Sequence, residues 1–257
     1  MPLFAHTPRM LFTATAPPSK QEELIKLMLL KDPVKIIMNP DRHNIFYNVI
    51  CRPPSQDTQD HLDEILDRIG EDLLKDPDNY PITIIYTDTR VIAYAYRYLE
   101  RKLGRKQYTG TVTPENRIFA QFHQEYTVKM KSHIVSEICK IDSKIRLVLA
   151  TVALGMGLDA PEIRRVIHYK PPTSLEKYFQ ETGRAGRDNK QSEAILYYNA
   201  TDIRSNRPGL TKEMARYCKT TVCLRETMLE YFGHKAPEYR IRNKCCCKCK
   251  EEITSAK

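Results

Sequence analysis

The sequence lacks several features that would assign a protein to a class at once. None of its apolar runs is long enough to cross a membrane as a helix. Residues 1–6, Met-Pro-Leu-Phe-Ala-His, have neither the basic start nor the apolar stretch of a secretory leader. Internal repeats and low-complexity tracts are also missing. We therefore expect a globular protein without membrane contact.

Two strings that bind nucleotides are absent as well. No segment matches G-x-x-x-x-G-K-[ST], the loop that cradles phosphates, and no D-E-x-H string occurs. Enzymes that hydrolyse ATP between two domains take the phosphate loop and the Mg²⁺ ligand from one domain and an arginine from the other. We expect this polypeptide alone to have no ATPase activity.

Cysteine and charge are both informative. Four of the eight cysteines crowd into positions 245–249, which favours metal ligation over a disulfide framework. This crowding indicates a reducing intracellular compartment, which in a eukaryote would be the nucleus. The formal net charge of +9 and the pI of about 9.1 favour an anionic partner such as a nucleic acid.

The most informative stretch is residues 178–188, Tyr-Phe-Gln-Glu-Thr-Gly-Arg-Ala-Gly-Arg-Asp. A capping box at Thr173 and Glu176 predicts that a helix begins there, and Leu175 and Phe179 have the spacing of its buried face. The stretch therefore reads as a helix that ends in two arginines, each preceded by a small residue.

Those arginines carry the chemistry of the stretch. Gly183 and Gly186 remove side chains beside Arg184 and Arg187. A guanidinium group is planar, permanently charged and able to bind phosphate through two parallel hydrogen bonds. Two of them at a helix end can reach across a cleft to a nucleotide phosphate. The alternative is a charged helix end on the surface, which the length of the matching string disfavours.

Four strings in the chain resemble those of one family. Residues 180–188 resemble motif VI of superfamily 2 helicases, in the form found in RecQ-family DNA helicases. Residues 147–161, an apolar strand that leads into Thr-Val-Ala-Leu-Gly-Met-Gly-Leu-Asp-Ala-Pro, resemble motif V. Residues 13–15, Thr-Ala-Thr, are similar to motif III. Residues 41–45, Asp-Arg-His-Asn-Ile, are similar to the Asp-Arg-Pro-Asn-Ile string that opens the second motor domain of RecQ proteins.

The resemblance implies an α/β fold. A RecA-like parallel sheet flanked by helices would be followed by a small helical zinc-binding subdomain. We expect residues 1–35 to be the end of a first RecA-like domain, 36–203 the second motor domain and 204–257 the zinc-binding subdomain.

The sequence pattern supports a parallel sheet. Apolar and β-branched segments alternate with helical patterns, as in parallel α/β sheets. The segments expected to be strands are 81–87, 147–151, 165–169 and 194–198. Residues 10–16 also read as a buried strand, and residues 104–120, which have no counterpart in the RecQ pattern, read as a solvated insertion.

The resemblance also implies roles at the nucleotide. Arg187 would be the arginine finger, Arg184 a second contact to the γ-phosphate, and Gln180 a relay of the nucleotide state. Gly157 and Asp159 of motif V would complete this side of the site. The nucleotide is expected to be ATP with Mg²⁺, held mainly by a first motor domain.

A nucleic-acid site is expected at the carboxyl ends of the strands, where ligands of parallel sheets collect. The residues expected to hold the phosphates of the tracked strand are Thr87, Arg90, Thr151 and Gly155. The resemblance to motif III implies that the hydroxyl groups of Thr13 and Thr15 couple this site to the nucleotide site. For Thr87 and Arg90, a helix cap and a surface arginine are an equally good explanation.

The C-terminal cysteines indicate a metal site. Cys223 opens a segment similar to the helix that supplies the first zinc ligand in RecQ helicases. Cys246 and Cys249 have the C-x-x-C spacing that tetrahedral thiolate sites commonly use. The expected Zn²⁺ ligands are Cys223, Cys245, Cys246 and Cys249, with Cys247 and His234 as rivals for the place of Cys245. The family spaces its loop cysteines more widely, so a degraded site is the alternative.

The sequence therefore predicts part of an ATP-dependent 3′ to 5′ DNA helicase that unwinds DNA in recombination and repair. Its partners would be single-stranded and branched duplex DNA, together with recombination and repair proteins. The chain is expected to be a fragment, a truncated gene product or a decayed copy. The alternatives are a non-catalytic DNA-binding module and a superfamily 2 RNA helicase.

Overall fold

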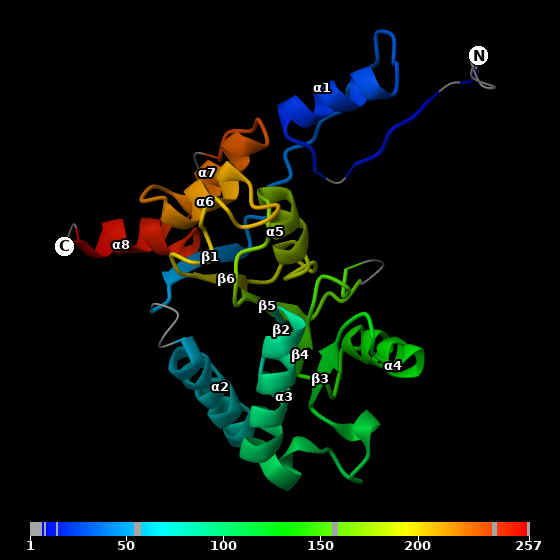
Figure 1. Ribbon diagram of the computed structural model, residues 1–257, viewed down its shortest axis with the longest axis vertical. Coiled ribbons are helices and arrows are strands. Elements are labelled where there is room, and N and C mark those ends of the chain that lie inside the picture. The colour runs from blue at the N-terminus through cyan, green and yellow to red at the C-terminus, as the bar shows by residue number, and fades with distance from the viewer. Residues whose placement is uncertain are drawn as a thin grey trace.

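The fold is a single parallel sheet with helices on both faces (Figure 1). The computed structural model describes residues 7, 9–13, 15–53, 58–155, 159–237 and 241–255. The six strands have the order β1-β6-β5-β2-β4-β3, and every neighbouring pair is parallel. Their bounds are β1 (Ile45–Cys51), β2 (Ile82–Tyr86), β3 (Phe119–Phe122), β4 (Leu147–Ala150), β5 (Ile163–His168) and β6 (Ser192–Tyr198).

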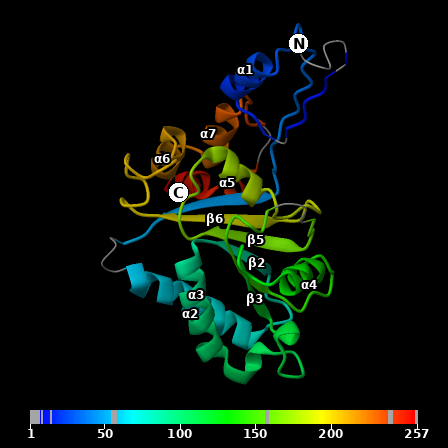
Figure 2. The ribbon, with the colours of Figure 1, turned by 45° about the vertical axis from the view of Figure 1, so that its right-hand side comes forward.

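The helices divide between the two faces of the sheet (Figure 2). One face carries α2 (Thr58–Lys75) and α3 (Thr89–Leu103), whose apolar stripes bury Leu66 and Leu99. The other face carries α4 (Val128–Ile138), α5 (Leu175–Thr182), α6 (Lys212–Lys219) and α7 (Leu224–Tyr231). The helix α8 (Cys247–Ser255) follows a short 3₁₀ turn, η4 (Arg242–Lys244), and lies at the outer strand β1. The predicted α/β fold with a helical C-terminal region is thereby confirmed.

The central strands form because their residues suit burial on both sides. All five residues of β2 and all four of β4 are buried, as expected for β-branched and aliphatic strands covered by helices on both faces. Parallel pairing brings the carboxyl ends of all the strands to one edge. The residues that follow β2 and β4 therefore lie side by side at this edge.

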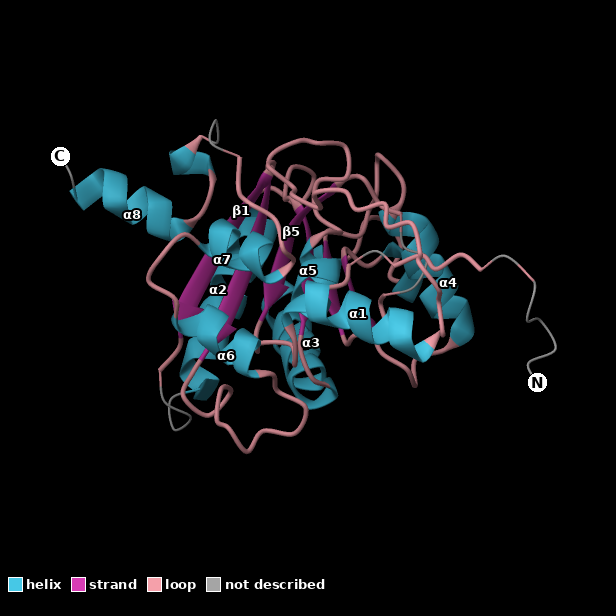
Figure 3. Ribbon diagram, turned by 90° about the horizontal axis from the view of Figure 1, so that it is seen from above, coloured by secondary structure: helices cyan, strands magenta, loops and turns pink. Residues whose placement is uncertain are grey.

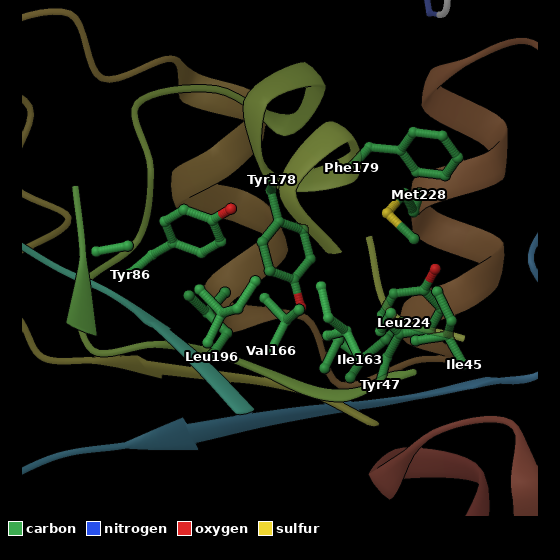
Figure 4. Packing of buried hydrophobic residues seen from close by; sticks show 14 of the residues in the cluster. Ile45, Tyr47, Tyr86, Ile163, Val166, Tyr178, Phe179, Leu196, Leu224 and Met228 are labelled. Atoms are coloured by element: carbon green, nitrogen blue, oxygen red, sulfur yellow. The ribbon is translucent and has the colours of Figure 1, made fainter. Parts of the chain in front are cut away.

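Helix α5 is held firmly on the sheet by Tyr178. Its ring, which is fully buried, points toward the sheet between Tyr86 and Leu224 in Figure 4. It also packs at 5.4 Å from Tyr217 of α6. Leu175 and Phe179 are buried as their spacing predicted. The position of this helix fixes where the chain after residue 182 emerges.

Two details differ from the sequence-based expectations: the N-terminal segment and the cap of α5. Residues 10–13 and 15–16 form no strand, and Met10 and Phe12 are 77% and 86% exposed, because no strand edge of the sheet lies beside them. Helix α1 (Pro18–Leu27) contains no buried residue and stands apart from the sheet (Figure 1). Seen from above, the N-terminal segment and α8 lie on opposite sides of the molecule (Figure 3). The cap of α5 is Ser174, whose hydroxyl accepts from Lys177 N, so the expected capping box at Thr173 is wrong by one residue.

The segment 104–120 is less of an insertion than expected. Two 3₁₀ turns, η2 (Gly104–Gln107) and η3 (Pro114–Asn116), lead directly into the edge strand β3. Phe119 is 1% exposed and the Arg117 guanidinium lies between the rings of Tyr96 and Tyr108 at 5.1 Å from each centroid. Only part of the expectation fails: residues 118–120 are buried in the core, whereas residues 104–106 and 110–112 are exposed to solvent.

Candidate nucleotide, nucleic-acid and metal sites

The turn that follows α5, residues 183–187, is defined here as the arginine turn. Gly186 has φ +59°, a left-handed conformation that favours glycine. A Cβ at this position would lie 2.4 Å from both Asn44 Nδ2 and Ser192 Oγ. The turn therefore needs glycine at position 186, both for its backbone conformation and for space. This conformation of the turn sets where Arg184 and Arg187 lie.

Arg184 points into the protein. It is only 9% exposed, and its Nη2 donates to Gly155 O at 2.5 Å. Its Nε has no hydrogen-bond partner among the described residues. Beside it, Tyr86 donates its hydroxyl to Leu154 O at 3.0 Å. The loop after β4 is thus attached through its backbone to both the arginine turn and β2.

Arg187 is arranged differently, at the surface. Its Nη1 donates to Asp159 Oδ1 at 2.8 Å, and the two side chains are 36% and 81% exposed. Exposed ion pairs contribute only about 0–1 kcal/mol. The Arg187 guanidinium can therefore leave Asp159 at little cost and bind another anion.

The acid that ends the string has a structural partner. Asp188 accepts from Arg164 Nη1 at 3.1 Å and Nη2 at 2.7 Å. Burial raises the pKa of Asp188, but hydrogen bonds from Lys190 and the charge of Arg164 outweigh it and hold this pKa below its ordinary value. The pair fastens the end of the arginine turn to the start of β5.

A buried polar pair lies beneath the arginine turn. His168 Nε2 is 2.7 Å from Glu181 Oε2, and the His168 ring stacks on Tyr86 with 5.2 Å between centroids. Burial raises the pKa of Tyr86, which is kept neutral. This group joins β2, β5 and α5 behind Arg184. Sequence reasoning missed it, because the only signal was a histidine at the end of an apolar strand.

The residues expected to relay the nucleotide state meet at the other side of α5. Gln180 Nε2 donates to Thr15 Oγ1 at 3.4 Å. Thr13 Oγ1 in turn donates to Thr15 O at 3.1 Å. The structure therefore brings Thr13, Thr15 and Gln180 together although 165 positions separate the bonded pair.

The expected nucleic-acid residues lie at the carboxyl edge of the sheet. Thr87 follows β2, and its N–H donates to Ala150 O at 2.9 Å, which places it beside Thr151. Thr87 Oγ1 has no hydrogen-bond partner among the described residues, whereas Thr151 Oγ1 accepts from Ala153 N at 3.3 Å. Arg90 is exposed in the first turn of α3. Gly155 lies instead against Arg184, as described above.

Two of the expected residues have other outcomes. Gly157 lies outside the described residues. The cap of α3 is Asp88, which accepts from Val91 N at 3.0 Å and from Lys170 Nζ at 2.6 Å. Thr87 is therefore not needed as the helix cap.

The four expected zinc ligands form one buried cluster. The sulfur atoms of Cys223, Cys245, Cys246 and Cys249 all lie within 4.8 Å of one another. Each side chain is at most 4% exposed. The rivals Cys247 and His234 are not members of this cluster in the part of the chain that the structure describes.

The geometry of the cluster suits a tetrahedral metal. Two sulfur ligands at the usual Zn–S length would be about 3.8 Å apart in a tetrahedron. The Sγ atom of Cys223 is 3.6 Å from that of Cys245 and 3.9 Å from that of Cys246. Close contact with the Cys223 and Cys245 side chains lowers the pKa of Cys246. These four cysteines are a candidate Zn²⁺ site.

Comparisons with known proteins agree with the geometry. The helicase conserved C-terminal domain family matches residues 66–189. The ATP-dependent DNA helicase Q-like 2 of Arabidopsis thaliana is 29% identical over 245 residues, which cover 91% of this chain and 32% of that protein. The putative ATP-dependent RNA helicase R290 of Acanthamoeba polyphaga mimivirus is 28% identical over 253 residues, 92% of this chain and 41% of its own length.

A solved structure shares the fold. The structure described as S. cerevisiae Dbp5 bound to RNA and ADP BeF3 matches with a TM-score of 0.55 at 15% identity, over 96% of this chain and 53% of that one. The chain spans about a third of the Arabidopsis relative and about two fifths of the viral one. No helix among the described residues is long and apolar enough to cross a membrane.

Fold and comparisons point to one class: residues 66–189 match the helicase conserved C-terminal domain family, and the chain shares its fold with the solved structure described above. Within that class its sequence is similar to RecQ-family DNA helicases. Curated helicases named as Q or RecQ-like types from a plant, a nematode and a frog match at 27–30% identity over about nine tenths of its length.

Proposed function

We propose that this chain is the part of a RecQ-type DNA helicase that completes the ATP site and holds the tracked DNA strand. The observation that carries the proposal is the arginine turn. It holds one guanidinium in the protein against the loop after β4 and leaves a second one weakly paired at the surface.

At the nucleotide, Arg187 acts as the arginine finger. Its exposed pair with Asp159 is easily exchanged for a phosphate oxygen, and its fork stabilises the charge that develops on the transferred phosphoryl group. Arg184 makes the second contact to the γ-phosphate and joins the turn to Gly155. Gly157, which lies outside the described residues, is proposed as a further contact to the nucleotide. ATP and Mg²⁺ are bound mainly by another domain, which supplies the phosphate loop.

At the nucleic acid, Thr87, Arg90 and Thr151 contact phosphates along the carboxyl edge. Support comes from the hydroxyl of Thr87, which has no hydrogen-bond partner in the described part of the chain, and from the exposed side chain of Arg90. Phosphate contacts fix the register of a strand without reading its sequence. The strand is DNA, single-stranded or in a branched duplex, and the setting is recombination and repair in a reducing compartment such as the nucleus.

The two sites communicate through Gln180 and Thr15. Their hydrogen bond joins the end of α5 to the stretch 1–35, which we assign to the end of the first motor domain. In the same division, residues 36–203 form the second motor domain and 204–257 the zinc-binding subdomain. Zn²⁺ held by the four cysteines supplies folding free energy to that subdomain directly.

A second candidate is unwinding of RNA. The viral relative, which is named as a putative RNA helicase, favours this candidate. The cysteine cluster and the RecQ form of residues 180–188 favour DNA. Competition between DNA and RNA strands of one sequence for the purified chain separates the two, and tighter binding of RNA would overturn the choice of DNA.

The function is tested by reconstitution. The chain is joined to a first motor domain of a RecQ helicase that carries the phosphate loop, and ATP turnover is measured with and without single-stranded DNA. We expect DNA-stimulated turnover by the joined protein and none by this chain alone. Turnover by the isolated chain, or none by a joined protein that binds ATP, contradicts the proposal.

A further inference from the structure

Three backbone carbonyls of the arginine turn are bound by one side chain. Arg42 Nη1 donates to Gly183 O at 3.1 Å, and its Nη2 donates to Ala185 O at 3.2 Å and to Gly186 O at 2.6 Å. These carbonyls follow the end of α5, where no helical donor remains for them. A cation at this helix end is also favoured by the helix dipole.

A second side chain from the same segment supports the turn. Asn44 is 5% exposed, and its Nδ2 donates to Gly186 O at 2.7 Å and to Lys190 O at 2.8 Å. The missing Cβ of Gly186 leaves the space that this amide occupies. The side chains of Arg42 and Asn44 therefore hold the arginine turn by hydrogen bonds to its backbone carbonyls.

The segment 41–45, which contains Arg42 and Asn44, is itself hydrogen-bonded to a buried arginine of α7. Arg225 is 2% exposed. Its Nη1 donates to Asp41 Oδ1 at 2.5 Å and to Arg42 O at 2.8 Å, and its Nη2 donates to Ile45 O at 2.5 Å. Breaking a buried arginine pair is costly because it leaves an uncompensated charge. Arg225 thus determines the path of residues 41–45.

Arg225 also stands next to the cysteine cluster. It follows Cys223 by two positions at the start of α7. On the neighbouring strand, Tyr47 N donates to Cys245 O at 3.2 Å. A continuous set of contacts therefore runs from the cysteines through Arg225 and residues 41–47 to the arginine turn.

We propose that Arg42 is the positioning residue of the arginine turn and that Arg225 connects it to the cysteine cluster. Order in the cluster and the geometry of Arg184 and Arg187 are then coupled through Arg225 and residues 41–45. The consequence for ATP rests on the function proposed above. The coupling does not, and it is measurable in the purified chain.

The test is amide hydrogen exchange in the full chain, compared with the substitution Arg42→Lys. A lysine keeps the charge but cannot span three carbonyls, because its ammonium is a single point. We expect the amides of Ala185 and Gly186 to exchange about tenfold faster, the effect of losing charged hydrogen bonds. Arg101→Lys, an exposed arginine of α3, is the matched control and should change nothing in the turn.

The substitution Arg225→Lys tests the connection. The same two amides should exchange at least about threefold faster, although Arg225 contacts neither of them. Strands β2 and β4 serve as the internal reference and should keep their exchange rates. Unchanged exchange at residues 183–187 in Arg42→Lys would overturn the positioning role. Faster exchange confined to α7 in Arg225→Lys would overturn the connection. If Arg225→Lys fails to fold, bound zinc is removed from the wild-type chain instead, with the same expected and contrary results.

The catalytic consequence is read in the chain joined to a phosphate-loop domain. Arg42→Lys should lower kcat about tenfold and leave KM for ATP within about twofold, because a displaced finger affects the transition state more than binding. A rise in KM with kcat unchanged would contradict the positioning role. Faster exchange together with unchanged kinetics would leave the coupling standing and overturn instead the role of these arginines at ATP.

Discussion

Gly186 offers the sharpest test of how the arginine turn is built. In Gly186→Ala the new Cβ would lie 2.4 Å from Asn44 Nδ2 and Ser192 Oγ, at a backbone φ of +59°. A left-handed conformation costs a residue with a side chain roughly 1–2 kcal/mol. Displacing Asn44 also breaks two buried hydrogen bonds, each worth about 1 kcal/mol. The free energy of unfolding should therefore fall by about 3–4 kcal/mol.

The matched control is Gly110→Ala. Gly110 has φ +90°, and nothing lies within 4 Å of an added Cβ. This variant should lose only the backbone contribution of roughly 1–2 kcal/mol. Urea unfolding followed by circular dichroism measures both losses. Equal losses within about 0.5 kcal/mol would show that the space at Gly186 does not matter and would refute the packing of the arginine turn.

Three further predictions concern the metal, pH and DNA. The purified chain should carry about one zinc per molecule. Cys249→Ala should lower the zinc content and should lower the Tm by about 10 °C or more. A wild-type chain that contains no metal and has reactive thiols would contradict the zinc site. Asp188 has a pKa below its ordinary value of 3.8, so its pair with Arg164 contributes fully to the free energy of unfolding above that pH, and this contribution is lost as pH falls through the folded pKa. Asp188→Asn should therefore remove this part of the loss of stability in acid. An unchanged pH dependence of stability would contradict the pair. Arg90→Ala should weaken binding of single-stranded DNA and reduce the slope of log K against log salt by about 0.7. Arg97→Ala, further along α3, should do neither. Equal effects of the two substitutions would contradict a DNA site at the carboxyl edge of the sheet.

Much of the fold follows from local patterns in the sequence. The buried run that becomes β2 and the helical spacing of Leu175 and Phe179 depend on neighbours along the chain, and both expectations hold in the structure. The cysteine spacing likewise indicates the cluster that the four sulfur atoms form. Local periodicity is sufficient in these cases, because each element buries the face that its own residues specify.

The expectations that failed and the contacts that were missed depend on which segments lie side by side in the fold. A local sequence pattern does not determine this. Residues 10–16 have the composition of a buried strand, but no strand edge lies beside them in the structure. His168 and Glu181 pair across elements, and Arg42 reaches carbonyls 141 to 144 positions away. Such contacts depend on the sheet order, and no spacing within the sequence encodes them. The support that Arg42 and Asn44 give to the arginine turn is therefore visible only in the structure.

The central claim is that Arg187 completes an ATP site whose other wall lies on another domain. The most direct measurement is single-turnover ATP hydrolysis by the joined protein with Arg187→Ala, beside Arg97→Ala as the exposed control. The account predicts a loss of roughly 10³-fold or more in the hydrolysis rate, with the affinity for ATP nearly unchanged and the control fully active. A hydrolysis rate for Arg187→Ala equal to that of the wild-type protein would contradict it.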